Sequence, residues 1–379
     1  MKPSRMLIFG GAVALVVWLS AFLLLREGGD PGSPAAALPP ESAVPPAAPP
    51  SAPEDAPEQG VPAEPPRSEP AEPTAGTPVP VRVARIPRPP RKALKSFRDA
   101  GEICVDAETG RMLAGTNVRR RCPPASVTKL MTLFLTLEAL DAGKIALNDV
   151  VPASRRAYSM GGTQLNLDTG EPCRIEELIY GLMLQSANDA AVVLAETVSG
   201  SVEDFVAAMN AKARELGLDD TRFATPHGLP PSRRERAAGA SPDLTTAEDL
   251  AKLSVALLKR FPNALRYAST ITHPYPANEK RKAVMWLKNH NRLLETFEGC
   301  DGLKTGWTND GASIVTTASR GNRRVIAVVL GGLVKNAKGE IDAKTSQRER
   351  NQRAAELMYR GLLALDAMQY APTPFRERK

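Results

Sequence analysis

Apolar and polar residues follow three different patterns along the 379-residue chain. From Met6 to Leu25 the only polar side chain is Ser20. Residues 31–90 then repeat proline with alanine, glutamate and serine, with almost no periodic spacing of branched apolar residues. Regular spacing of apolar side chains begins near Leu94. The pattern therefore predicts one folded body that follows an apolar segment and a long spacer.

The folded body opens with the pattern of a β-hairpin and then a helix. Two apolar runs, Glu102–Asp106 and Arg111–Ala114, flank the turn sequence Glu108–Gly110. A helix is predicted from the Pro123–Ser126 region to Ala142, just before Gly143. Leucine, methionine and phenylalanine lie on almost every side of this helix, so we expect it to be buried in the middle of a domain.

Predicted helices fill the middle of the body, and predicted strands lie near its end. Helical periodicity covers residues 175–184, 189–198, 202–216, 247–260 and 347–365. Short runs rich in β-forming residues cover 302–306, 313–319 and 325–330. This order predicts an α+β fold in which both ends of the body contribute strands to one sheet around a helical insertion.

The apolar N-terminal segment has the length of a membrane-spanning helix. Its 20 residues match the thickness of a bilayer core. Because Lys2 and Arg5 precede it, we expect a cytoplasmic stub (1–5) and a single-pass anchor in the cytoplasmic membrane (6–25), with the body on the extracytoplasmic, periplasmic side. A cleaved signal peptide is the alternative, but its apolar region is usually shorter and ends at a small-x-small site, which is missing here.

The remaining boundaries follow from composition. Residues 26–93 are predicted to form a proline-rich disordered linker, which at polyproline spacing extends to roughly 190 Å. Residues 94–370 form the folded body, and 371–379 a short tail. The linker lets a body tied to the membrane reach a target well away from it.

The net charge and the cysteine spacing argue against several classes of function. The net charge is +7, with basic residues concentrated at the end of the linker. An exported body meets little nucleic acid, so we expect this region to be a solvated tether and exclude a nucleic-acid partner. Four cysteines without C-x-x-C spacing argue against metal or thioredoxin-like sites. Disulfides and buried free thiols both stay open for Cys104, Cys122, Cys173 and Cys300.

Ser126-Val127-Thr128-Lys129 places a hydroxyl and an amine within one turn at the start of the predicted helix. A serine becomes a nucleophile when a neighbouring base takes its proton, and a lysine is such a base only if its charged form is destabilised. Burial and the positive end of a helix dipole both destabilise it. Taken alone, the motif is a weak signal and is better explained by a helix cap followed by a solvated lysine.

Two further motifs strengthen the catalytic interpretation. Ser186-Ala187-Asn188 lies between two helical runs, where short polar side chains also occur as caps. Lys304-Thr305-Gly306 lies in a predicted strand, so Lys304 and Gly306 share one face. A cation there can hold a carboxylate, and a glycine lets a substrate backbone approach the strand. The plainer interpretation is a surface lysine in an edge strand.

The order S-x-x-K, S-x-N, K-T-G is the signature of penicillin-binding proteins and serine β-lactamases. Together with the sequences Gly161–Leu165, Leu184–Ala191, His227–Leu229 and Asp301–Thr308, it makes the body similar to the low-molecular-mass D-alanyl-D-alanine carboxypeptidases of the bacterial wall. The resemblance extends over roughly residues 94–365. It implies an antiparallel sheet flanked by helices, with the active site where the sheet meets a helical subdomain.

The resemblance also implies roles for individual residues. The implied catalytic residues are Ser126 as nucleophile, Lys129 as base, and Ser186 and Asn188 as proton path and amide holder. The implied substrate-binding residues are Lys304, Thr305, Gly306, Trp307 and Arg350, with an oxyanion N–H from Trp307 and carboxylate steering by Arg350. Peptidoglycan stem peptide is the expected substrate, β-lactam antibiotics are the expected inhibitors, and neither a cofactor nor a metal is expected.

Three other functions stay open. The first is a D,D-endopeptidase that acts on cross-links. The second is a serine β-lactamase, although the E-x-x-L-N loop of its commonest class does not occur after Asn188. The third is a silent wall-binding module. His227, His273 and His290 are expected to have structural roles, because no G-x-S-x-G nucleophile elbow occurs.

Overall fold

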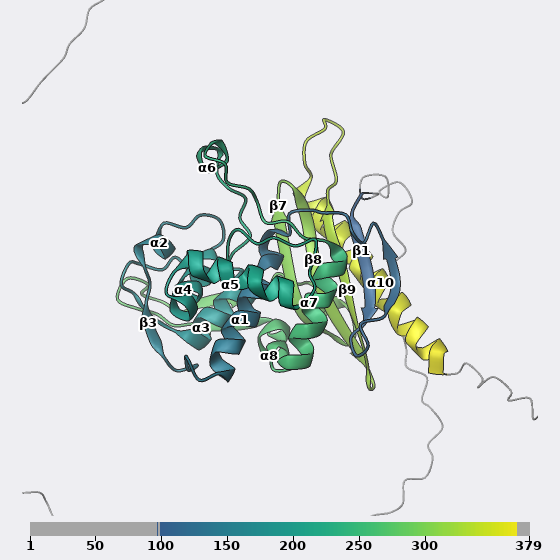
Figure 1. The fold of residues 1–379 in the computed structure, drawn as a ribbon, viewed down its shortest axis with the longest axis horizontal. Coiled ribbons are helices and arrows are strands. Elements are labelled where there is room, and N and C mark those ends of the chain that lie inside the picture. The colour runs from purple at the N-terminus through teal and green to yellow at the C-terminus, as the bar shows by residue number, and fades with distance from the viewer. Residues whose placement is uncertain (1–96, 98, 370–379) are drawn as a thin grey trace, which may run out of the picture. The chain divides into compact units, whose positions relative to one another are not determined.

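Alternating buried side chains place a five-stranded sheet between two layers of helices (Figure 1). The computed structural model describes Phe97 and residues 99–369 of the chain. Strand order is β2-β1-β9-β8-β7, and all neighbours in this sheet are antiparallel. Its strands are β1 (Gly101–Asp106), β2 (Met112–Thr116), β7 (Cys300–Thr308), β8 (Gly311–Arg320) and β9 (Arg323–Gly332).

The two faces of the sheet belong to two separate apolar clusters. On β9, Ile326 and Val328 join the larger cluster, while Ala327 and Val329 join the smaller one. This follows from the period of two along a strand. The smaller cluster is closed by the long helix α10 (Ala343–Gln369), which lies along β8 and β9. Both faces are therefore covered, and the sequence pattern of an α+β fold assembled from both ends is confirmed.

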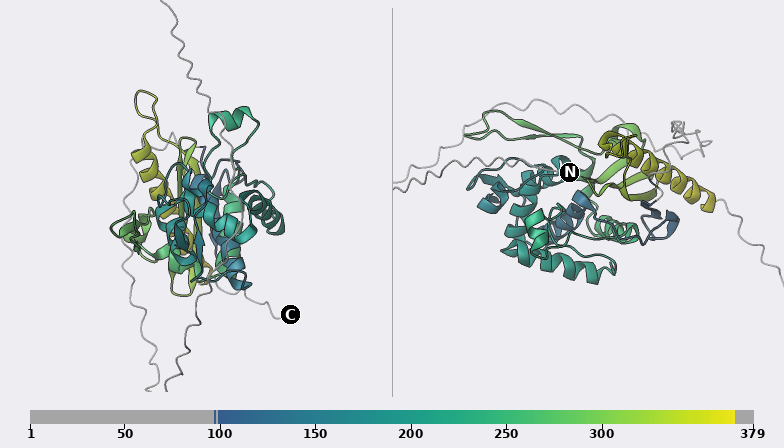
Figure 2. Two further views of the ribbon diagram at one scale, coloured as in Figure 1. Left: turned by 90° about the vertical axis from the view of Figure 1, so that its left-hand side faces the viewer. Right: turned by 90° about the horizontal axis from the view of Figure 1, so that it is seen from above.

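The larger cluster joins the sheet to the helical part of the molecule. Figure 2 shows that part from two further sides. Its helices are α1 (Lys129–Asp141), α2 (Arg155–Tyr158), α3 (Ile175–Tyr180), α4 (Asn188–Ser199), α5 (Val202–Glu215), α6 (Arg233–Ala237), α7 (Ala247–Arg260), α8 (Ala264–Ser269) and α9 (Leu293–Thr296). The predicted central helix is observed as α1, and its apolar residues from Leu130 to Leu137 are buried, as expected.

Several short elements have no counterpart in the sequence pattern. A 3₁₀ turn, η2 (Ala125–Thr128), precedes α1, and a π-helical turn, η3 (Gly181–Gln185), ends the run that begins with α3. Two-stranded ribbons pair β3 (Val150–Pro152) with β4 (Pro172–Arg174), and β5 (Thr272–Tyr275) with β6 (Met285–Lys288). Strands of three or four residues are too short to show a period, so the pattern could not predict them.

The predicted anchor (6–25), linker (26–93) and tail (371–379) lie outside the described residues. Across Phe97 and 99–369, no helix combines the length and the apolar character needed to cross a bilayer. The cysteine alternatives are resolved in favour of thiols, because all four cysteines are unpaired and three of them are buried. Burial raises the pKa of Cys104 to about 12, so this thiol stays protonated.

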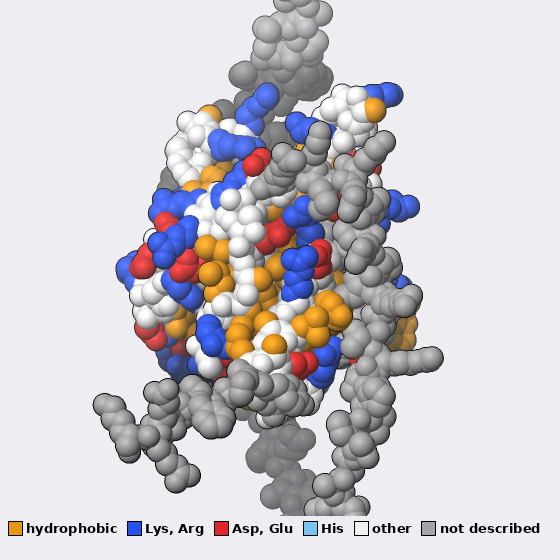
Figure 3. Space-filling view, turned by 90° about the vertical axis from the view of Figure 1, so that its right-hand side faces the viewer, with side chains coloured by type: hydrophobic (Ala, Val, Ile, Leu, Met, Phe, Trp, Pro, Cys, Tyr) orange, Lys and Arg blue, Asp and Glu red, His pale blue; other side chains and the backbone are white. Residues whose placement is uncertain are grey.

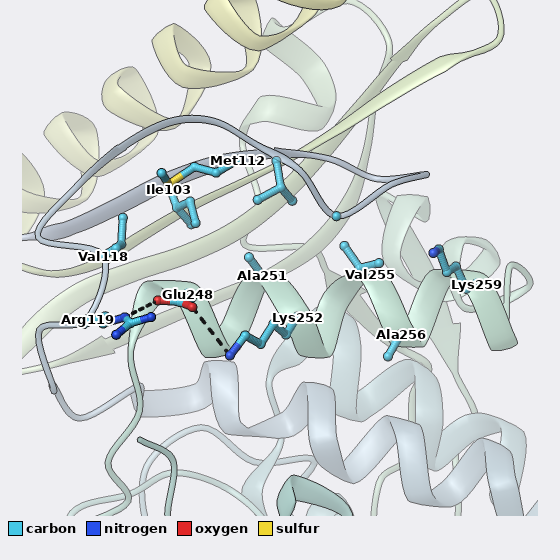
Figure 4. Close-up of a pocket in the computed structure, with 12 residues that line it drawn as sticks. Ile103, Met112, Val118, Arg119, Glu248, Ala251, Lys252, Val255, Ala256 and Lys259 are labelled. Carbon is cyan, nitrogen blue, oxygen red and sulfur yellow. Dashed lines mark hydrogen bonds and ion pairs between the residues drawn. The ribbon is translucent and has the colours of Figure 1, made fainter. Parts of the chain in front are cut away.

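Apolar side chains gather on the outer face that the β1–β2 hairpin and α10 form (Figure 3). Met112 of β2 is exposed, as are Leu363 and Met368 near the end of α10. Between the hairpin and α7 lies an apolar groove of about 580 Å³, shown in Figure 4. On its rim Glu248 forms ion pairs with Arg119 and Lys252. The groove contains no serine or cysteine beside a base, so it is not a candidate for nucleophilic catalysis.

Candidate active site

The turn η2 holds Ser126 at the mouth of a second cavity, of about 400 Å³. Ser126 is half-buried, and the next turn begins α1 at Lys129. The preceding Ala125 has a φ of 53°, in the left-handed region that residues other than glycine rarely adopt. A strained residue directly before a serine at a cavity marks the turn as a candidate functional site.

Two glycines leave room for this turn. A Cβ on Gly306 of β7 would lie 2.7 Å from Pro124 O and 3.2 Å from Ser126 N. A Cβ on Gly228 would lie 2.0 Å from Ala125 O, and the φ of Gly228 is +81°. The glycine of the third motif therefore lets η2, the turn that holds the candidate nucleophile Ser126 (the nucleophile turn), approach the strand. The sequence had suggested that Gly306 admits a substrate backbone, and the contacts add this second reason for a glycine.

Gly228→Ala should displace the nucleophile turn. We expect a loss of about 2–4 kcal/mol in the free energy of unfolding, from the positive φ and the contact with Ala125 together, and at least a tenfold slower acylation of Ser126. Thermal unfolding and the rate of labelling by a fluorescent penicillin measure both effects. The matched control is Gly170→Ala, because Gly170 has the same φ of +81° but no atom near the added Cβ. Equal behaviour of the two variants would contradict the contact.

Lys129 points its amine at three oxygen atoms. Its Nζ lies 3.1 Å from Ser126 Oγ, 2.7 Å from Asn188 Oδ1 and 2.7 Å from the His227 carbonyl oxygen. The orientation of the Asn188 amide is fixed, because Nδ2 donates to Gly161 O at 2.8 Å. Asn188 and His227 therefore present only acceptors to the amine.

Burial lowers the pKa of Lys129 well below its usual range, and the nearby charge of Lys304 lowers it further. The carboxylates of Asp243 and Asp189 act in the opposite direction with smaller effects. A neutral amine has two N–H donors and one lone pair. Since Asn188 and His227 take the two donors, the lone pair is left for the hydroxyl of Ser126. The geometry thus gives Lys129 the arrangement of a base toward Ser126.

The second motif lies at the joint between η3 and α4. Ser186 has a φ of 62° and closes the π-helical turn in the left-handed conformation. Its buried Oγ has no hydrogen-bond partner among the described groups, although the side chain lines the cavity. A buried hydroxyl without a partner is costly in a purely structural role. Its position in the cavity wall leaves it available to a substrate or to a proton in transit.

Asn188 and Asp189 hold the loop that closes one side of the cavity. Asn188 N donates to Thr163 O at 2.8 Å, so Thr163 reaches the cavity wall. The carboxylate of Asp189 accepts the N–H groups of Leu165 and Leu167 at 3.0–3.2 Å. These contacts explain why the sequence Gly161–Leu165 accompanies the second motif.

Asp243 connects the nucleophile turn to the His227 segment. Its Oδ2 accepts the hydroxyl of Thr128 at 2.7 Å, and its Oδ1 accepts the N–H groups of Ala224 and Thr225 at 2.7 and 3.0 Å. This buried carboxylate fixes the segment that presents the His227 carbonyl to Lys129. Asp243 is thus a positioning residue, and the sequence analysis did not identify it.

The third motif and Arg350 form the opposite wall of the cavity. Lys304 is 1% exposed, and within the described part of the chain its amine donates to Thr305 O, at 3.1 Å. Arg350 of α10 donates to Gly306 O and Ser313 O at 3.3 Å. Thr305, Gly306, Trp307 and Arg350 all line the cavity. Within the described part of the chain neither cation has a carboxylate partner.

Two buried cations without a counter-ion favour an anionic ligand. Burial and the charge of Arg350 lower the pKa of Lys304 to about 7, and burial lowers that of Arg350 to about 10. An unpaired buried cation is costly, and an incoming carboxylate would offset that cost. No group of histidine, cysteine or acidic side chains in the described residues has the arrangement of a metal site.

A family model described as D-alanyl-D-alanine carboxypeptidase matches residues 91–333, which is more than half of the chain. The chain belongs to this D-alanyl-D-alanine carboxypeptidase family. It is 40% identical over 230 residues to D-alanyl-D-alanine carboxypeptidase DacF of Bacillus subtilis, covering 60% of this chain and 56% of that one. It is 36% identical over 237 residues to DacC of Escherichia coli, covering 60% and 55%.

Solved structures of the family have the same fold. The D-alanyl-D-alanine carboxypeptidase DacD of Francisella tularensis matches with a TM-score of 0.61 and 26% identity, over 74% of this chain and 73% of that one. Penicillin-binding protein D2 of Listeria monocytogenes, in its ampicillin-bound form, matches with a TM-score of 0.56 and 29% identity, over 68% and 96%. The chain spans just over half the length of the two curated relatives above.

Within the family fold, the motif residues named from the sequence meet at one place. Ser126, Ser186 and Thr305 line the cavity directly, while Lys129 and Asn188 lie buried behind its wall. The wall also includes Thr163, Lys288, Asn289, His290, Arg292, Gln347 and Asn351. The sequence analysis named Thr163 only within the run Gly161–Leu165, expected a structural role for His290, and did not identify the other five. A run of basic residues at alternate positions, Lys288-Asn289-His290-Asn291-Arg292, was the available signal.

The three histidines occupy different places. His227 is buried, accepts the N–H of Leu229 at its Nδ1 (3.1 Å), and has its pKa lowered to about 3, chiefly by burial. The ring is therefore neutral and structural, while its backbone carbonyl contacts Lys129. His273 stacks on Tyr180 and contacts Glu177 at 2.9 Å. His290 differs, because it lines the cavity.

Proposed function

We propose that this chain is a serine-type D-Ala-D-Ala carboxypeptidase that trims peptidoglycan stem peptides through an acyl-enzyme on Ser126. The observation that carries the proposal is the amine of Lys129, buried among two acceptors and 3.1 Å from Ser126 Oγ. Family membership and the names of the relatives support the same activity.

Acylation begins when Ser126 Oγ attacks the carbonyl carbon of the penultimate D-alanine. Its proton passes to the lone pair of Lys129 Nζ. The N–H groups of Ser126 and Trp307 are the proposed donors to the negative oxygen of the tetrahedral intermediate. As the peptide C–N bond breaks, the departing amine of D-alanine takes a proton, delivered through the hydroxyl of Ser186. Water then hydrolyses the ester and restores Ser126.

The proposed specificity for a chain end comes from the cationic wall. Lys304, Thr305 and Arg350 would receive the terminal carboxylate, because Thr305 and Arg350 line the cavity, Lys304 lies buried behind it, and neither cation has an acidic partner among the described residues. A peptide bond with no carboxylate on its leaving residue would leave these cations buried and unpaired. Cleavage should therefore be confined to a residue that carries a free carboxylate.

β-Lactam antibiotics are proposed to acylate Ser126 and to remain attached. No aspartate or glutamate appears among the described residues that line the cavity, so none is available there to activate a deacylating water. The ampicillin-bound form of the Listeria protein supports binding of this drug class within the family. A penicilloyl ester that turns over rapidly would instead favour a β-lactamase.

We also propose a location for the reaction. The apolar segment 6–25 would anchor the chain once in the cytoplasmic membrane, and the linker 26–93 would carry the catalytic part to the wall on the extracytoplasmic side. The composition of these residues supports this proposal. Protease accessibility of the catalytic part in spheroplasts, compared with lysed cells, tests the orientation.

The decisive experiment compares two pentapeptides that differ only at the C-terminus. We expect release of D-alanine from the free acid, and about a hundredfold lower kcat/KM for the terminal carboxamide, since a buried charge pair is lost. Mass spectrometry identifies the products. A cross-linked dimer in a parallel reaction reports endopeptidase action. Absence of D-alanine release from the free acid would refute the carboxypeptidase, and equal rates for acid and amide would refute the carboxylate site.

A further inference from the structure

A row of basic side chains borders the cavity, and the proposed reaction assigns it no role. The segment from Lys288 to Arg292 connects β6 to α9. Lys288, His290 and Arg292 line the cavity with exposed side chains. Asn289 and Asn291, which alternate with them, are 7% and 2% exposed, and the buried Asn289 also contacts the cavity.

The two asparagines fix the direction of the basic row. Asn289 Nδ2 donates to Ala268 O and Thr270 O at 3.0 and 2.9 Å, and Asn289 Oδ1 accepts Asn291 N at 3.0 Å. Asn291 Nδ2 donates to Gly302 O at 3.1 Å. Because α8 and β7 thus hold both amides, the segment is kept in one orientation. The exposed side chains of Lys288, His290 and Arg292 are thereby placed at the cavity.

The positive charge of the cavity exceeds what one carboxylate would balance. Arg350 and the basic row line it, and Lys304 lies buried behind it, while none of the described lining residues is acidic. In the described part of the chain no ion pair is formed by Lys288. Arg292 forms one, with Glu295 at 3.4 Å, and both side chains of this pair are about half exposed. Such an exposed pair is weak, so Arg292 remains available to a ligand.

We propose that Lys288 and Arg292 bind a second carboxylate of the substrate, in addition to the terminal carboxylate at Lys304 and Arg350. This inference rests on the proposed function and narrows its substrate class to peptides with a further free carboxylate near the scissile bond. That group belongs either to the stem residue before the D-alanines or to the leaving residue. The interaction is non-covalent and leaves the chemistry at Ser126 unchanged.

His290 supplies an independent reporter inside the same wall. Desolvation of its ring lowers its pKa to about 4, with the charges of Lys304, Arg350 and Arg292 acting in the same direction. A carboxylate bound at the row would oppose those charges and raise the pKa of His290. NMR titration of the ring C–H signals measures this, with His290→Gln assigning the signal among the three histidines of the chain.

The kinetic test uses two pairs of peptides that all keep the C-terminal carboxylate. In one pair, the stem residue before the D-alanines carries a side-chain carboxylate in the first peptide and the corresponding carboxamide in the second. In the other pair the leaving residue is D-glutamate or D-glutamine. We expect the wild-type protein to prefer the carboxylate member of one pair by about three- to tenfold in kcat/KM, and the pair that responds identifies the source of the group.

Variants of the row must remove that preference. Lys288→Gln with Arg292→Gln should bring the carboxylate peptide down to the rate of its amide, and Lys288→Glu with Arg292→Glu should reverse the order. Lys282→Gln is the matched control, because Lys282 is an exposed lysine between β5 and β6 that does not line the cavity. The side chains of Lys288 and Arg292 are exposed, so these variants should fold, which thermal unfolding verifies.

The outcomes separate this inference from the proposed function. If D-alanine is released but neither pair shows a preference, or if the preference survives the double glutamine variant, the second carboxylate site is wrong and the carboxypeptidase stands. If no peptide is cleaved, the carboxypeptidase is wrong. In that case the NMR titration of His290, carried out on Ser126→Ala protein, still tests the second carboxylate site. A pKa of His290 that is equal with the carboxylate and amide peptides of both pairs overturns the inference.

Discussion

Ser126→Ala should lose about 10⁵-fold or more in kcat for D-alanine release, because every productive step passes through the missing oxygen. Labelling by a fluorescent penicillin should disappear as well, since no acyl-enzyme can form. The hydroxyl contacts Lys129 and faces the cavity, so its removal leaves the apolar core untouched. We therefore expect the thermal midpoint to stay within a few degrees of the wild type.

The serine test has a matched control elsewhere in the chain. Ser241 is exposed and lies away from the cavity, so Ser241→Ala should keep both activity and labelling. Labelling that persists in Ser126→Ala would assign the nucleophile to another residue. Loss of both readouts together with a large drop in thermal midpoint would indicate unfolding, and Ser126→Cys, which retains a nucleophilic atom, would then be the variant to label.

Lys129→Met should slow acylation by about 10²- to 10⁴-fold, the usual contribution of a positioned base. Methionine fills a similar volume but offers no lone pair to Ser126. The single-turnover rate of penicilloyl formation is the appropriate measurement, because it isolates the step that needs the base. A rate within tenfold of the wild type would show that Lys129 is not the base.

The same substitution makes a second, thermodynamic prediction. The folded pKa of Lys129 is lowered, so between that pKa and the unfolded value of about 10.5 the unfolded chain binds one more proton than the folded chain. The wild type therefore gains stability as pH rises through this window, by about 1.4 kcal/mol per pH unit. Lys129→Met removes this dependence, so its stability relative to the wild type should improve as pH falls from 9 to 6.

Denaturant unfolding of both proteins at several pH values checks this slope. Lys282→Met on the surface controls for the loss of one lysine. A difference between wild type and Lys129→Met that does not change with pH would show that the folded protein holds a charged Lys129. Such a result would leave the hydroxyl of Ser126 without a lone pair to accept its proton.

The three motifs could be found in the sequence because their spacing is local. Ser126 and Lys129 lie within one turn, and Ser186 with Asn188 within another, so their order along the chain was sufficient to indicate the family. Long amphipathic or apolar periods likewise indicated α1, α7 and the strands β8 and β9 correctly. Elements of three or four residues, such as β3, carry no such period, and they became visible only in the fold.

The sequence pattern could not predict the contacts that position the residues of the site. Asp243 is 117 positions from Ser126, and the carbonyl of His227 is a backbone group with no residue preference. The role of Gly228 depends on its packing against a segment far away in the sequence, where an added Cβ would lie 2.0 Å from Ala125 O. The basic row at Lys288 could be recognised from its alternation with asparagine, but only the fold shows that its three basic side chains line the cavity while α8 and β7 hold the two asparagine amides.

The sequence by itself determined the chemistry present in this protein: a serine with a lysine one turn away, a strand lysine, an α+β body, and an apolar N-terminal segment. These follow from side-chain type and from periods shorter than ten residues. Only the tertiary structure shows in which direction the pKa of Lys129 is shifted and toward which atom its lone pair is directed. A pKa depends on burial and on charges brought from distant segments, and a lone pair is directed only when every other partner of the amine is in place.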